Sequence, residues 1–350
     1  CVDEIEAASA DAWRMPDLGP DSLAFLQYTS GSTSEPKGVM VSHGNLLANV
    51  GMLEGTMRYG PDMSMVSWLP MYHDMGLIGN VLGPLAVGGR TALMSPHAFV
   101  RSPGRWLQLI TRHRATMTGA PNFAYALAVK HATDALKAEL DLSTLTVCYC
   151  GSEPIQAPVM QAFVDTFRPC GLQPGAFYAC YGMAETTLLS TGNVVGGGTP
   201  VLRVDADALT RGVAVPSEAP AARAVVGCGY STDGQELRIV DPETRLPLDD
   251  GHVGEIWVRG PHVTQGYWRR PELTAEIFEA TLANGDGPFL RTGDLAFLHE
   301  ANVYVAGRRK DLIIVRGRNY HPQDIEAAAA ASSPALNPAA AAFSVARDGE

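Results

Sequence analysis

A polar stretch near the start of the chain combines the groups that bind phosphate. Residues 28–38 read YTSGSTSEPKG, in which Lys37 supplies a positive charge and Gly31 and Gly38 let the backbone approach a ligand closely. Hydroxyl groups and backbone N–H donors come from Thr29, Ser30, Ser32, Thr33 and Ser34. Successive N–H groups can form an anion-binding nest, so the stretch predicts a phosphate loop. It lacks the Walker A spacing, and an ordinary surface loop rich in serine and glycine is the alternative.

Two carboxylates further along the chain have the sequence context expected for metal and sugar binding. Glu185 in YGMAET (181–186) follows a strand-like run and is placed to hold Mg²⁺, while Tyr181 offers an aromatic face on which a base can stack. Asp294 in RTGD (291–294) is expected in a turn, where its carboxylate can accept hydrogen bonds from both hydroxyls of a ribose. The alternatives are that Tyr181 only packs and that Glu185 caps a helix.

Other residues of interest have two interpretations each. Arg308 and Lys310, in GRRKDLIIVRGRN (307–319), add positive charge that a nucleotide can use, although Arg308 can equally pair with a surface acid. His73, in PMYHDMG, is a candidate for lining or gating a ligand pocket, or a hydrogen-bonded structural histidine. Three apolar side chains either line a ligand tunnel or simply fill the core: Trp68, Met71 and Met75.

The elements that must position these residues alternate between strand and helix. The strand-like runs are LAFLQY (23–28), MVSWL (65–69), TALM (91–94), ATMTG (115–119), LTVCYC (145–150) and AFYACY (176–181). The helix-like runs are SHGNLLANVGML with Ser42 as N-cap, MGLIGNVLGPLAVG, GRWLQLITRHR, NFAYALAVKHA and APVMQAFVDTF. This alternation predicts an α/β unit with a mostly parallel sheet, in which ligands gather at the carboxyl ends of strands. The phosphate loop follows LAFLQY and is expected at such an end.

The second half of the chain has a different pattern. Residues 193–226 are rich in Gly, Pro and Ala with weak periodicity, and we interpret them as a long excursion or insertion. Short strand-like runs then predict a small β-rich, barrel-like subdomain over 227–308. We therefore expect an α/β part over 1–225 and a separate small α+β part over 309–350.

Composition excludes several classes of protein. The chain has 350 residues, a formal charge of −11 and 46% hydrophobic residues, which is a globular composition without the basic face of a nucleic-acid binder. No run approaches the length of apolar sequence needed to span a membrane. The six cysteines form no C-x-x-C pair, so they predict small buried side chains in a reducing cytoplasm rather than a zinc site.

Five segments in order carry a resemblance to a known family. They are YTSGSTSEPKG, YGMAET, GEIWVRGPHVTQGYW (254–268), RTGD and GRRKDLIIVRGRN. With them the chain resembles the adenylate-forming enzymes from Phe25 to about Phe343. WLPMYHDMGLIG (68–79), GSEPI (151–155) and GRNYHPQDIE (317–326) make it most similar to the fatty acyl-AMP ligases within that family.

The resemblance implies a two-step reaction. A fatty carboxylate attacks the α-phosphate of ATP to give acyl-AMP and pyrophosphate, and the acyl group then passes to the phosphopantetheine thiol of an acyl carrier protein in lipid or polyketide synthesis. Glu185 would hold Mg²⁺, Lys310 would lie at the hinge between half-reactions, and the pocket or tunnel candidates named above (His73, Trp68, Met71 and Met75) would contact the acyl group. Residues 1–225 would be the α/β part of the adenylation domain, incomplete at its N-terminus, and 309–350 the hinge and the start of a truncated C-terminal domain. The residues that would cradle the β- and γ-phosphates are Thr29, Ser30, Gly31, Ser32, Thr33 and Lys37. The residues that would hold adenine and ribose are Gly151, Ser152, Glu153, Tyr181, Gly182, Met183, Ala184, Asp294 and Arg308.

Two further expectations come with this resemblance. An insertion at 193–226 is thought to restrain the C-terminal part and to disfavour CoA as the acceptor. No segment matches the motif of the family's C-terminal catalytic lysine, so the chain is either a fragment or a degenerate copy, and its intact nucleotide motifs favour a fragment. A fatty acyl-CoA ligase and a non-catalytic nucleotide-binding module are the alternative functions.

Overall fold

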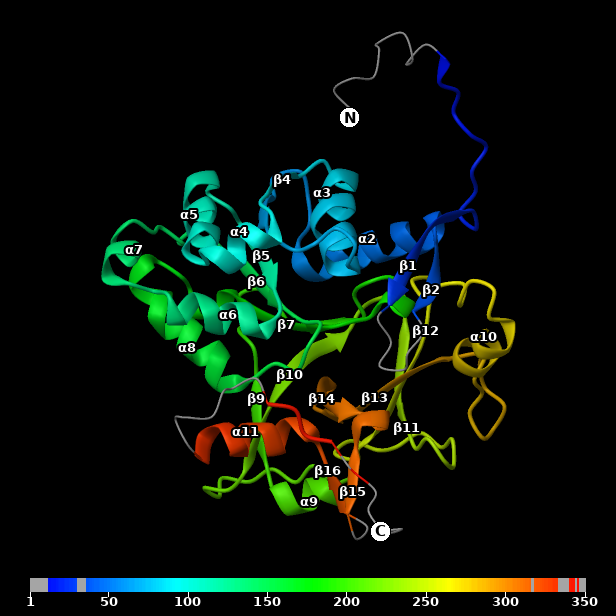
Figure 1. The fold of residues 1–350 in the computed structure, drawn as a ribbon. Helices are drawn as coiled ribbons and strands as arrows, with labels where there is room; N and C mark the ends of the chain where they lie inside the picture. The colour runs from blue at the N-terminus through cyan, green and yellow to red at the C-terminus, as the bar shows by residue number, and fades with distance from the viewer. Residues whose placement is uncertain (1–11, 30–35, 316–317, 333–339, 344, 346–350) are drawn as a thin grey trace.

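A parallel sheet flanked by helices forms the first part of the molecule (Figure 1). The computed structural model describes residues 12–29, 36–315, 318–332, 340–343 and 345. The parallel strands are β3 (Ser64–Ser67), β4 (Arg90–Leu93), β5 (Met117–Ala120), β6 (Val147–Cys150) and β7 (Phe177–Tyr181), in the spatial order β4-β3-β5-β6-β7. This arrangement confirms the predicted α/β class.

The cysteines in the described ranges form no disulfide, and they are buried apart from Cys180, which is half-buried.

The predicted helix-like runs correspond to α2 (His43–Met57), α3 (Gly83–Ala86), α5 (Gly104–His113), α6 (Asn122–Lys130) and α8 (Ala157–Phe167). Two short helices were not predicted: α4 (Pro96–Arg101) and α7 (Asp134–Ala138). Ser42 caps α2 as predicted. Its hydroxyl accepts a hydrogen bond from the Asn45 backbone N–H, and the Asn45 side-chain oxygen accepts one from the Ser42 backbone N–H. The run MGLIGNVL departs from an α-helix and forms a π-helix, η2 (Met75–Leu82), a rare form that often marks functional sites.

The strand before the phosphate loop does not belong to the parallel sheet, which corrects one prediction. β1 (Leu23–Thr29) pairs antiparallel with β2 (Lys37–Ser42) in a separate two-stranded sheet. The phosphate loop therefore joins the two strands of a hairpin instead of following a parallel strand. Apolar alternation in LAFLQY identified a strand correctly but carried no information about its partner.

The hairpin is attached to the rest of the molecule by its backbone. Met40 N–H donates to the Gly266 carbonyl at 2.9 Å, and Trp268 N–H donates to the Gly38 carbonyl at 2.8 Å. Val39 also bridges to Tyr267. The segment 265–268 thus pairs with the outer side of β2 and holds the start of β2 in place.

The second half of the molecule is antiparallel and continues the same sheet. Its strands are β8 (Thr191–Gly192), β10 (Arg223–Ser231), β11 (Glu236–Val240), β12 (Gly254–Arg259), β13 (Leu290–His299) and β14 (Asn302–Arg308), while α10 (Pro271–Phe278) lies between β12 and β13. β8 joins this part to β7, and the complete sheet has 12 strands. Asp294 lies inside β13 opposite Arg308 of β14, not in a turn as predicted. RTGD keeps an irregular backbone within β13, because the register with β12 shifts between Glu255 and Trp257 and the Gly293 and Asp294 N–H groups donate to side chains.

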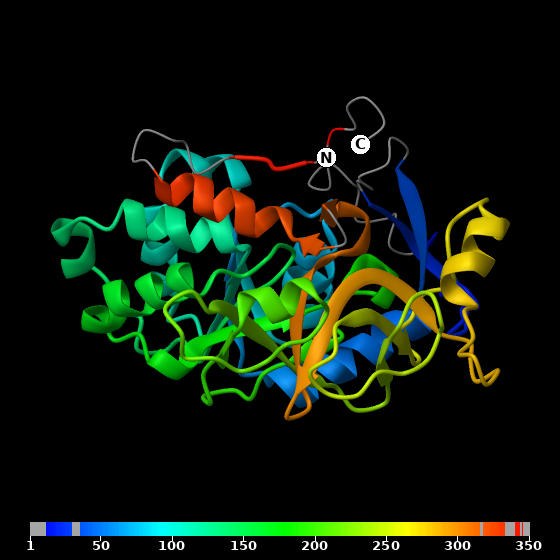
Figure 2. The same ribbon diagram turned by 90° about the horizontal axis from the view of Figure 1, so that it is seen from below.

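The glycine-rich segment 193–226 contains more regular structure than its composition suggested. It holds β9 (Val201–Val204), α9 (Ala206–Thr210) and the start of β10, and β9 pairs with β10. α9 contacts β16 (Arg318–Tyr320), which pairs with β15 (Ile313–Val315) ahead of α11 (Pro322–Ser332). The Arg223 guanidinium lies 2.9 Å from an Asp324 carboxylate oxygen on α11. This segment therefore touches the last part of the chain, which Figure 2 shows lying across the molecule.

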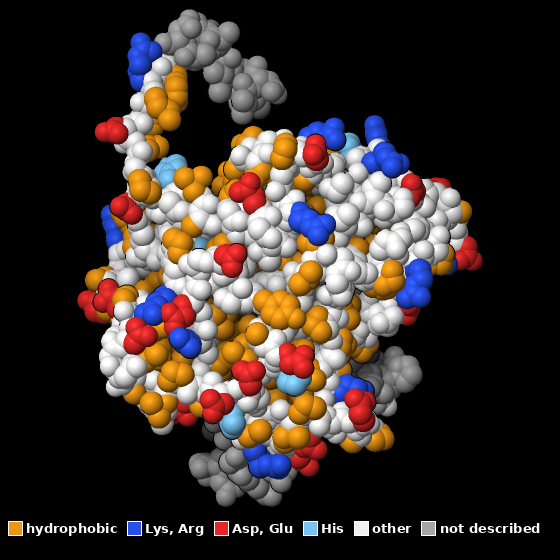
Figure 3. Space-filling model, turned by 180° about the vertical axis from the view of Figure 1, so that it is seen from behind, with side chains coloured by type: hydrophobic (Ala, Val, Ile, Leu, Met, Phe, Trp, Pro, Cys, Tyr) orange, Lys and Arg blue, Asp and Glu red, His pale blue; other side chains and the backbone are white. Residues whose placement is uncertain are grey.

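The surface and the helices set limits on the kind of protein. No helix within the described ranges is long and apolar enough to cross a bilayer. On the face shown in Figure 3, lysine and arginine side chains are scattered among acidic and apolar ones. That face has no continuous basic stripe among its described residues, in line with the formal charge of −11.

Candidate active site

Three parallel strands deliver the candidate residues to one edge of the sheet. β6 runs into Gly151 and Ser152, β7 runs into Gly182 and Glu185, and the segment after β3 leads to Asp74 at the N-cap of η2. Because these strands are parallel, their carboxyl ends meet at the same edge, where open α/β sheets bind ligands. The parallel topology thus brings together the predicted residues of the segments 151–153 and 181–185.

Glu185 is a buried carboxylate held from two sides. It lies in a short 3₁₀ turn, η5 (Ala184–Thr186), and is 7% exposed. One carboxylate oxygen accepts a hydrogen bond from the Tyr267 hydroxyl at 2.6 Å, and the Thr264 N–H and hydroxyl both donate to the Glu185 carbonyl. Burial raises the pKa of the Glu185 carboxyl, and the Tyr267 hydrogen bond opposes that shift. A nearby cation would favour the charged form.

Lys37 approaches the same place from the hairpin. Its ammonium group lies 5.1 Å from the centroid of the Tyr267 ring, within cation–π range. Thr29 is its register partner on β1, so the two ends of the phosphate loop lie opposite each other. Four other predicted members of this loop lie outside the described residues: Ser30, Gly31, Ser32 and Thr33.

Asp294 forms a second buried acidic centre. It is 7% exposed, one carboxylate oxygen accepts a hydrogen bond from the Tyr181 hydroxyl at 2.8 Å, and the other lies 3.3 Å from Arg308 Nε. Burial raises the pKa of Asp294, and the Arg308 charge counteracts it. Tyr181 is therefore tied to the predicted sugar-binding carboxylate by its hydroxyl. Arg308 and Lys310 are exposed beside it, with Lys310 in η6 (Arg309–Asp311).

An ion pair that the sequence reading missed orders the segment ahead of Asp294. Glu255 on β12 is 2% exposed and accepts two hydrogen bonds from the Arg291 guanidinium, at 2.8 and 3.1 Å. Its other oxygen accepts the Gly293 N–H at 3.0 Å. A glutamate in an apolar strand and an arginine at the head of RTGD were the available signals, since a buried charge needs a partner.

The segment after β6 has an unusual backbone. Ser152 has a positive φ of 68°, which non-glycine residues adopt rarely. Glu153 accepts the Phe123 N–H at 2.6 Å and so ties this segment to the start of α6. After β7, Gly182 leaves no space for a side chain, because an added Cβ would lie 1.7 Å from the Leu188 carbonyl oxygen. Met183 and Ala184 continue from Gly182 into η5.

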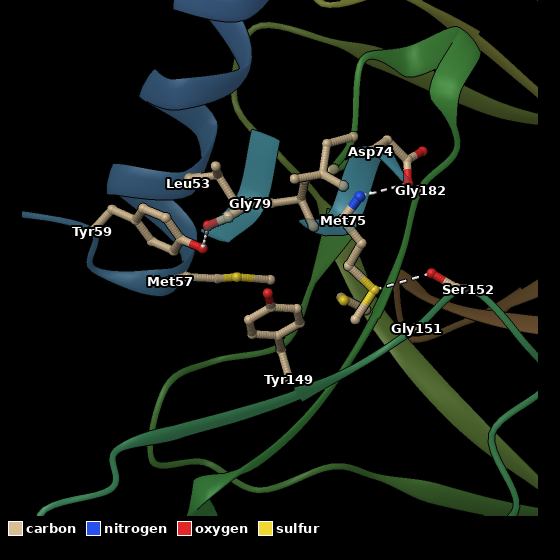
Figure 4. A pocket seen from close by; sticks show the side chains of 13 residues that line it. Leu53, Met57, Tyr59, Asp74, Met75, Gly79, Tyr149, Gly151, Ser152 and Gly182 are labelled. Carbon is tan, nitrogen blue, oxygen red and sulfur yellow. Dashed lines mark hydrogen bonds between the residues drawn. The ribbon is translucent and has the colours of Figure 1, made fainter. Parts of the chain in front are cut away.

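A small, mainly apolar pocket opens between these segments (Figure 4). Its volume is about 40 Å³. The walls come from α2, η2 and the ends of β6 and β7, and the lining residues are Leu53, Met57, Tyr59, Asp74, Met75, Gly79, Tyr149, Gly151, Ser152, Cys180, Gly182, Leu188 and Leu189. The pocket and the Glu185 centre thus share the segment 182–189, in which Gly182, Leu188 and Leu189 line the pocket and Glu185 lies in η5.

Two tyrosines close the inner part of this pocket. The Tyr59 hydroxyl donates to the Gly79 carbonyl at 2.8 Å, and the Tyr149 hydroxyl donates to the Asn80 side-chain oxygen. Because both hydroxyl groups are satisfied within the protein, the rings present carbon surface to the cavity. The inner wall of the pocket is therefore apolar, and its volume of about 40 Å³ has room for only a few water-sized groups.

The structure separates the residues predicted for an acyl tunnel. Met75 lines the pocket, with its sulfur 3.0 Å from the Ser152 hydroxyl. Trp68 is core and stacks on Phe99 at 3.9 Å, while Met71 is 57% exposed. His73 is also exposed and does not line the pocket.

Asp74, which the sequence reading missed, lines the pocket next to His73. One of its carboxylate oxygens lies 2.6 Å from the His73 Nδ1, and the Asp74 hydrogen bond raises the pKa of His73.

A second, more open cavity of about 430 Å³ lies on the other face of α2 and contains none of the predicted residues.

A magnesium ion at Glu185 fits only with help from a ligand. Within the described ranges, no group of three or more His, Cys, Asp or Glu side chains is arranged to hold a metal. Mg²⁺ bound with nucleotides usually takes one or two carboxylates and completes its shell with phosphates and water. A lone buried carboxylate near Lys37 fits that arrangement.

Comparisons with known proteins agree with this geometry. The model of the AMP-binding enzyme family matches residues 2–268. The chain is 42% identical over 332 residues to the medium-chain-fatty-acid–[acyl-carrier-protein] ligase TtuA of Teredinibacter turnerae, covering 92% of this chain and 52% of that protein. It is 43% identical over 315 residues to a long-chain-fatty-acid–AMP ligase of Mycobacterium marinum, covering 87% and 54%.

A solved structure matches the fold over the whole chain. It is the fatty acyl-adenylate ligase of L. pneumophila in complex with acyl adenylate and pyrophosphate, with a TM-score of 0.86 and 39% identity, and the match covers 100% of this chain and 62% of that one. The chain spans about half the length of the two curated relatives, at 52% and 54%. From the family match, the identities and the shared fold, we conclude that the chain belongs to the AMP-binding enzyme family.

Proposed function

We propose that the protein activates a fatty acid with ATP to form acyl-AMP and pyrophosphate. The observation that carries this proposal is the shared boundary between an apolar pocket and a polar centre. Gly182 and Leu188 line the pocket, and the segment between them contains Glu185. A fatty acid bound at this boundary would present its carboxylate to the nucleotide side, which is what an adenylating enzyme requires.

The residues divide the chemistry as follows. One carboxylate oxygen of the acid attacks the α-phosphorus of ATP, the new P–O bond forms, and the bond to the pyrophosphate oxygen breaks. Lys37, with the donors of the phosphate loop, stabilises the charge on the leaving pyrophosphate. Bound through Glu185, Mg²⁺ would supply further charge neutralisation of the phosphates. These roles are supported by the convergence of Lys37 and Glu185 on Tyr267.

The nucleoside end is assigned to the second acidic centre. Asp294 and Arg308 would bind the ribose hydroxyls, and Tyr181 with the 151–153 and 182–184 segments would contact adenine. Support for this assignment comes from the Tyr181–Asp294 hydrogen bond at 2.8 Å and from the Arg308–Asp294 approach at 3.3 Å. Lys310 follows directly and is proposed as the hinge between the part over 1–308 and the part over 309–350.

For the second step we propose an acyl carrier protein thiol as the acceptor. One relative is named as an acyl-carrier-protein ligase. Segment 193–226 contacts β16 through α9 and α11 through the Arg223–Asp324 pair, which supports its proposed restraint on the C-terminal part. Deleting the parts of 193–226 that lie outside β9, α9 and β10 tests this restraint. A folded variant that gains no acyl transfer to CoA would contradict it.

The decisive experiment incubates the full-length protein with fatty acids of several lengths, ATP and Mg²⁺, with CoA in one reaction and a holo carrier protein in another. We expect acyl-AMP in both, and acyl transfer to the carrier only, by mass spectrometry. Acyl-CoA would identify a fatty acyl-CoA ligase. No adenylate in either reaction would leave a non-catalytic nucleotide-binding module.

A further inference from the structure

Tyr267 joins three parts of the site that are far apart in the sequence. Its hydroxyl donates a hydrogen bond to a Glu185 carboxylate oxygen at 2.6 Å, across 82 positions of the chain. The Lys37 ammonium lies over its ring, 5.1 Å from the ring centroid. The side chain is 5% exposed. No other residue with a described side-chain contact links the hairpin lysine to the carboxylate of η5.

The position of Tyr267 is set independently of both partners. On one side its backbone bridges to Val39 of β2. On the other, its N–H donates to the Thr274 hydroxyl of α10 at 3.0 Å, and its ring packs edge-on against Phe278 with centroids 5.2 Å apart. The preceding Gly266 has φ 104° and leaves no space for a side chain, since an added Cβ would lie 2.2 Å from Thr274. The contacts with β2 and α10 therefore fix the position of the Tyr267 ring.

We propose that Tyr267 is a positioning residue that sets the distance between the metal-binding carboxylate of Glu185 and the phosphate-binding ammonium of Lys37. This inference rests on the proposed function, because it assumes that both groups act on one nucleotide. The hydroxyl orients one carboxylate oxygen and leaves the carboxylate's remaining lone pairs for a cation. The ring face holds the lysine without a hydrogen bond, so all three ammonium protons stay available to phosphate oxygens.

The two contacts predict separable effects, which two substitutions in the full-length protein distinguish. Tyr267→Phe removes the hydroxyl and keeps the ring, whereas Tyr267→Leu removes both. Binding of ATP is measured by calorimetry in EDTA and over a series of Mg²⁺ concentrations. For Tyr267→Phe we expect unchanged ATP affinity in EDTA and an increase of about tenfold in the Mg²⁺ concentration at half-maximal effect, as for loss of a hydrogen bond to a charged group.

Tyr267→Leu should add a second effect. Without the ring, ATP affinity in EDTA should fall by about three- to tenfold, the range that corresponds to a partly buried cation–π contact. Tyr178→Phe is the matched control, because it removes a buried hydroxyl that donates to the Thr56 carbonyl at 3.3 Å, away from both acidic centres. It should change thermal stability but neither of the two binding quantities.

Glu185→Gln separates failure of this inference from failure of the proposed function. If Glu185→Gln shifts the Mg²⁺ midpoint and Tyr267→Phe does not, the positioning role is wrong and the function stands. If neither shifts it, the metal role of Glu185 is wrong as well. A Tyr267→Phe variant that loses ATP affinity equally with and without Mg²⁺ would show a merely structural tyrosine. In the Glu185→Gln background, Tyr267→Phe should produce no further shift.

Discussion

The nucleotide side and the acyl pocket of the site are built in opposite ways. On the nucleotide side, each charged group is held by a partner from a remote segment, as Tyr267 holds Glu185 and Tyr181 holds Asp294. In the pocket, most lining side chains are apolar and the tyrosine hydroxyls are bonded within the protein, as in the hydrogen bond from Tyr59 to the Gly79 carbonyl. One region binds through fixed dipoles and charges, and the other mainly through shape.

This difference predicts which substitutions change rate and which change selectivity. A fixed charge acts on the phosphates of every substrate, so its loss lowers turnover regardless of the acid. A pocket wall contacts only the far end of the acyl chain, so a substitution there changes the preference of the enzyme for acids of different length. The predictions below test this division, beginning with the largest effect.

Lys37→Ala should have the largest effect. Removing the positive charge next to the phosphate loop should lower acyl-AMP formation by about 100- to 1,000-fold, as for loss of one group that stabilises transition-state charge. The loss should be the same for short and long acids. Pyrophosphate release measured across a series of chain lengths checks this. A rate that recovers for one chain length would contradict the division between the two regions.

Gly79→Ala should act on selectivity instead. An added Cβ there lies 3.2 Å from Leu188 and 3.4 Å from the Tyr149 hydroxyl, at the pocket wall. We expect acids that fill the pocket to lose about tenfold or more in kcat/KM, the amount associated with one methylene, while shorter acids are unaffected. Gly55→Ala, on α2 with nothing within 4 Å of the added carbon, is the control. Uniform loss across all acids would place Gly79 outside the acyl site.

Asp294→Asn tests the nucleotide side through pH. Burial raises the pKa of Asp294, so between the ordinary aspartate pKa and the raised one the folded protein binds more protons than the unfolded chain. The free energy of unfolding should then fall as pH rises through this window, and the Asn variant should lack that slope. At pH 7 the variant should bind ATP about tenfold more weakly yet unfold at no lower temperature.

Thermal unfolding and ATP titration between pH 4 and 7 measure both quantities. A variant that unfolds at a clearly lower temperature at pH 7 would show that Arg308 and Tyr181 more than offset the cost of burying the Asp294 charge.

Short, local motifs were located correctly from the sequence, whereas the functions of their residues stay predictions. Ser42 as a helix cap and the placement of Glu185 shortly after β7 follow from neighbouring residues alone. The hairpin of β1 was missed because alternation identifies a strand but not its partner. Asp294 was placed in a turn because Thr and Gly precede it, whereas its strand depends on pairing with β14. Tyr267 and Asp74 were missed since their roles depend on contacts or cavities formed only in three dimensions.

Cys180→Ala should have the smallest effect and sharpens the comparison from the pocket side. This thiol lines the pocket and donates to the Cys150 carbonyl at 3.4 Å, and burial raises its pKa, so it is protonated and unreactive at neutral pH. Its removal should change chain-length preference by less than about fourfold, the ratio for one methylene-sized group. Competition between two acids for limiting ATP resolves such a ratio. A large loss of adenylation for every acid would mean that the thiol contributes chemistry, and that the pocket acts through more than shape.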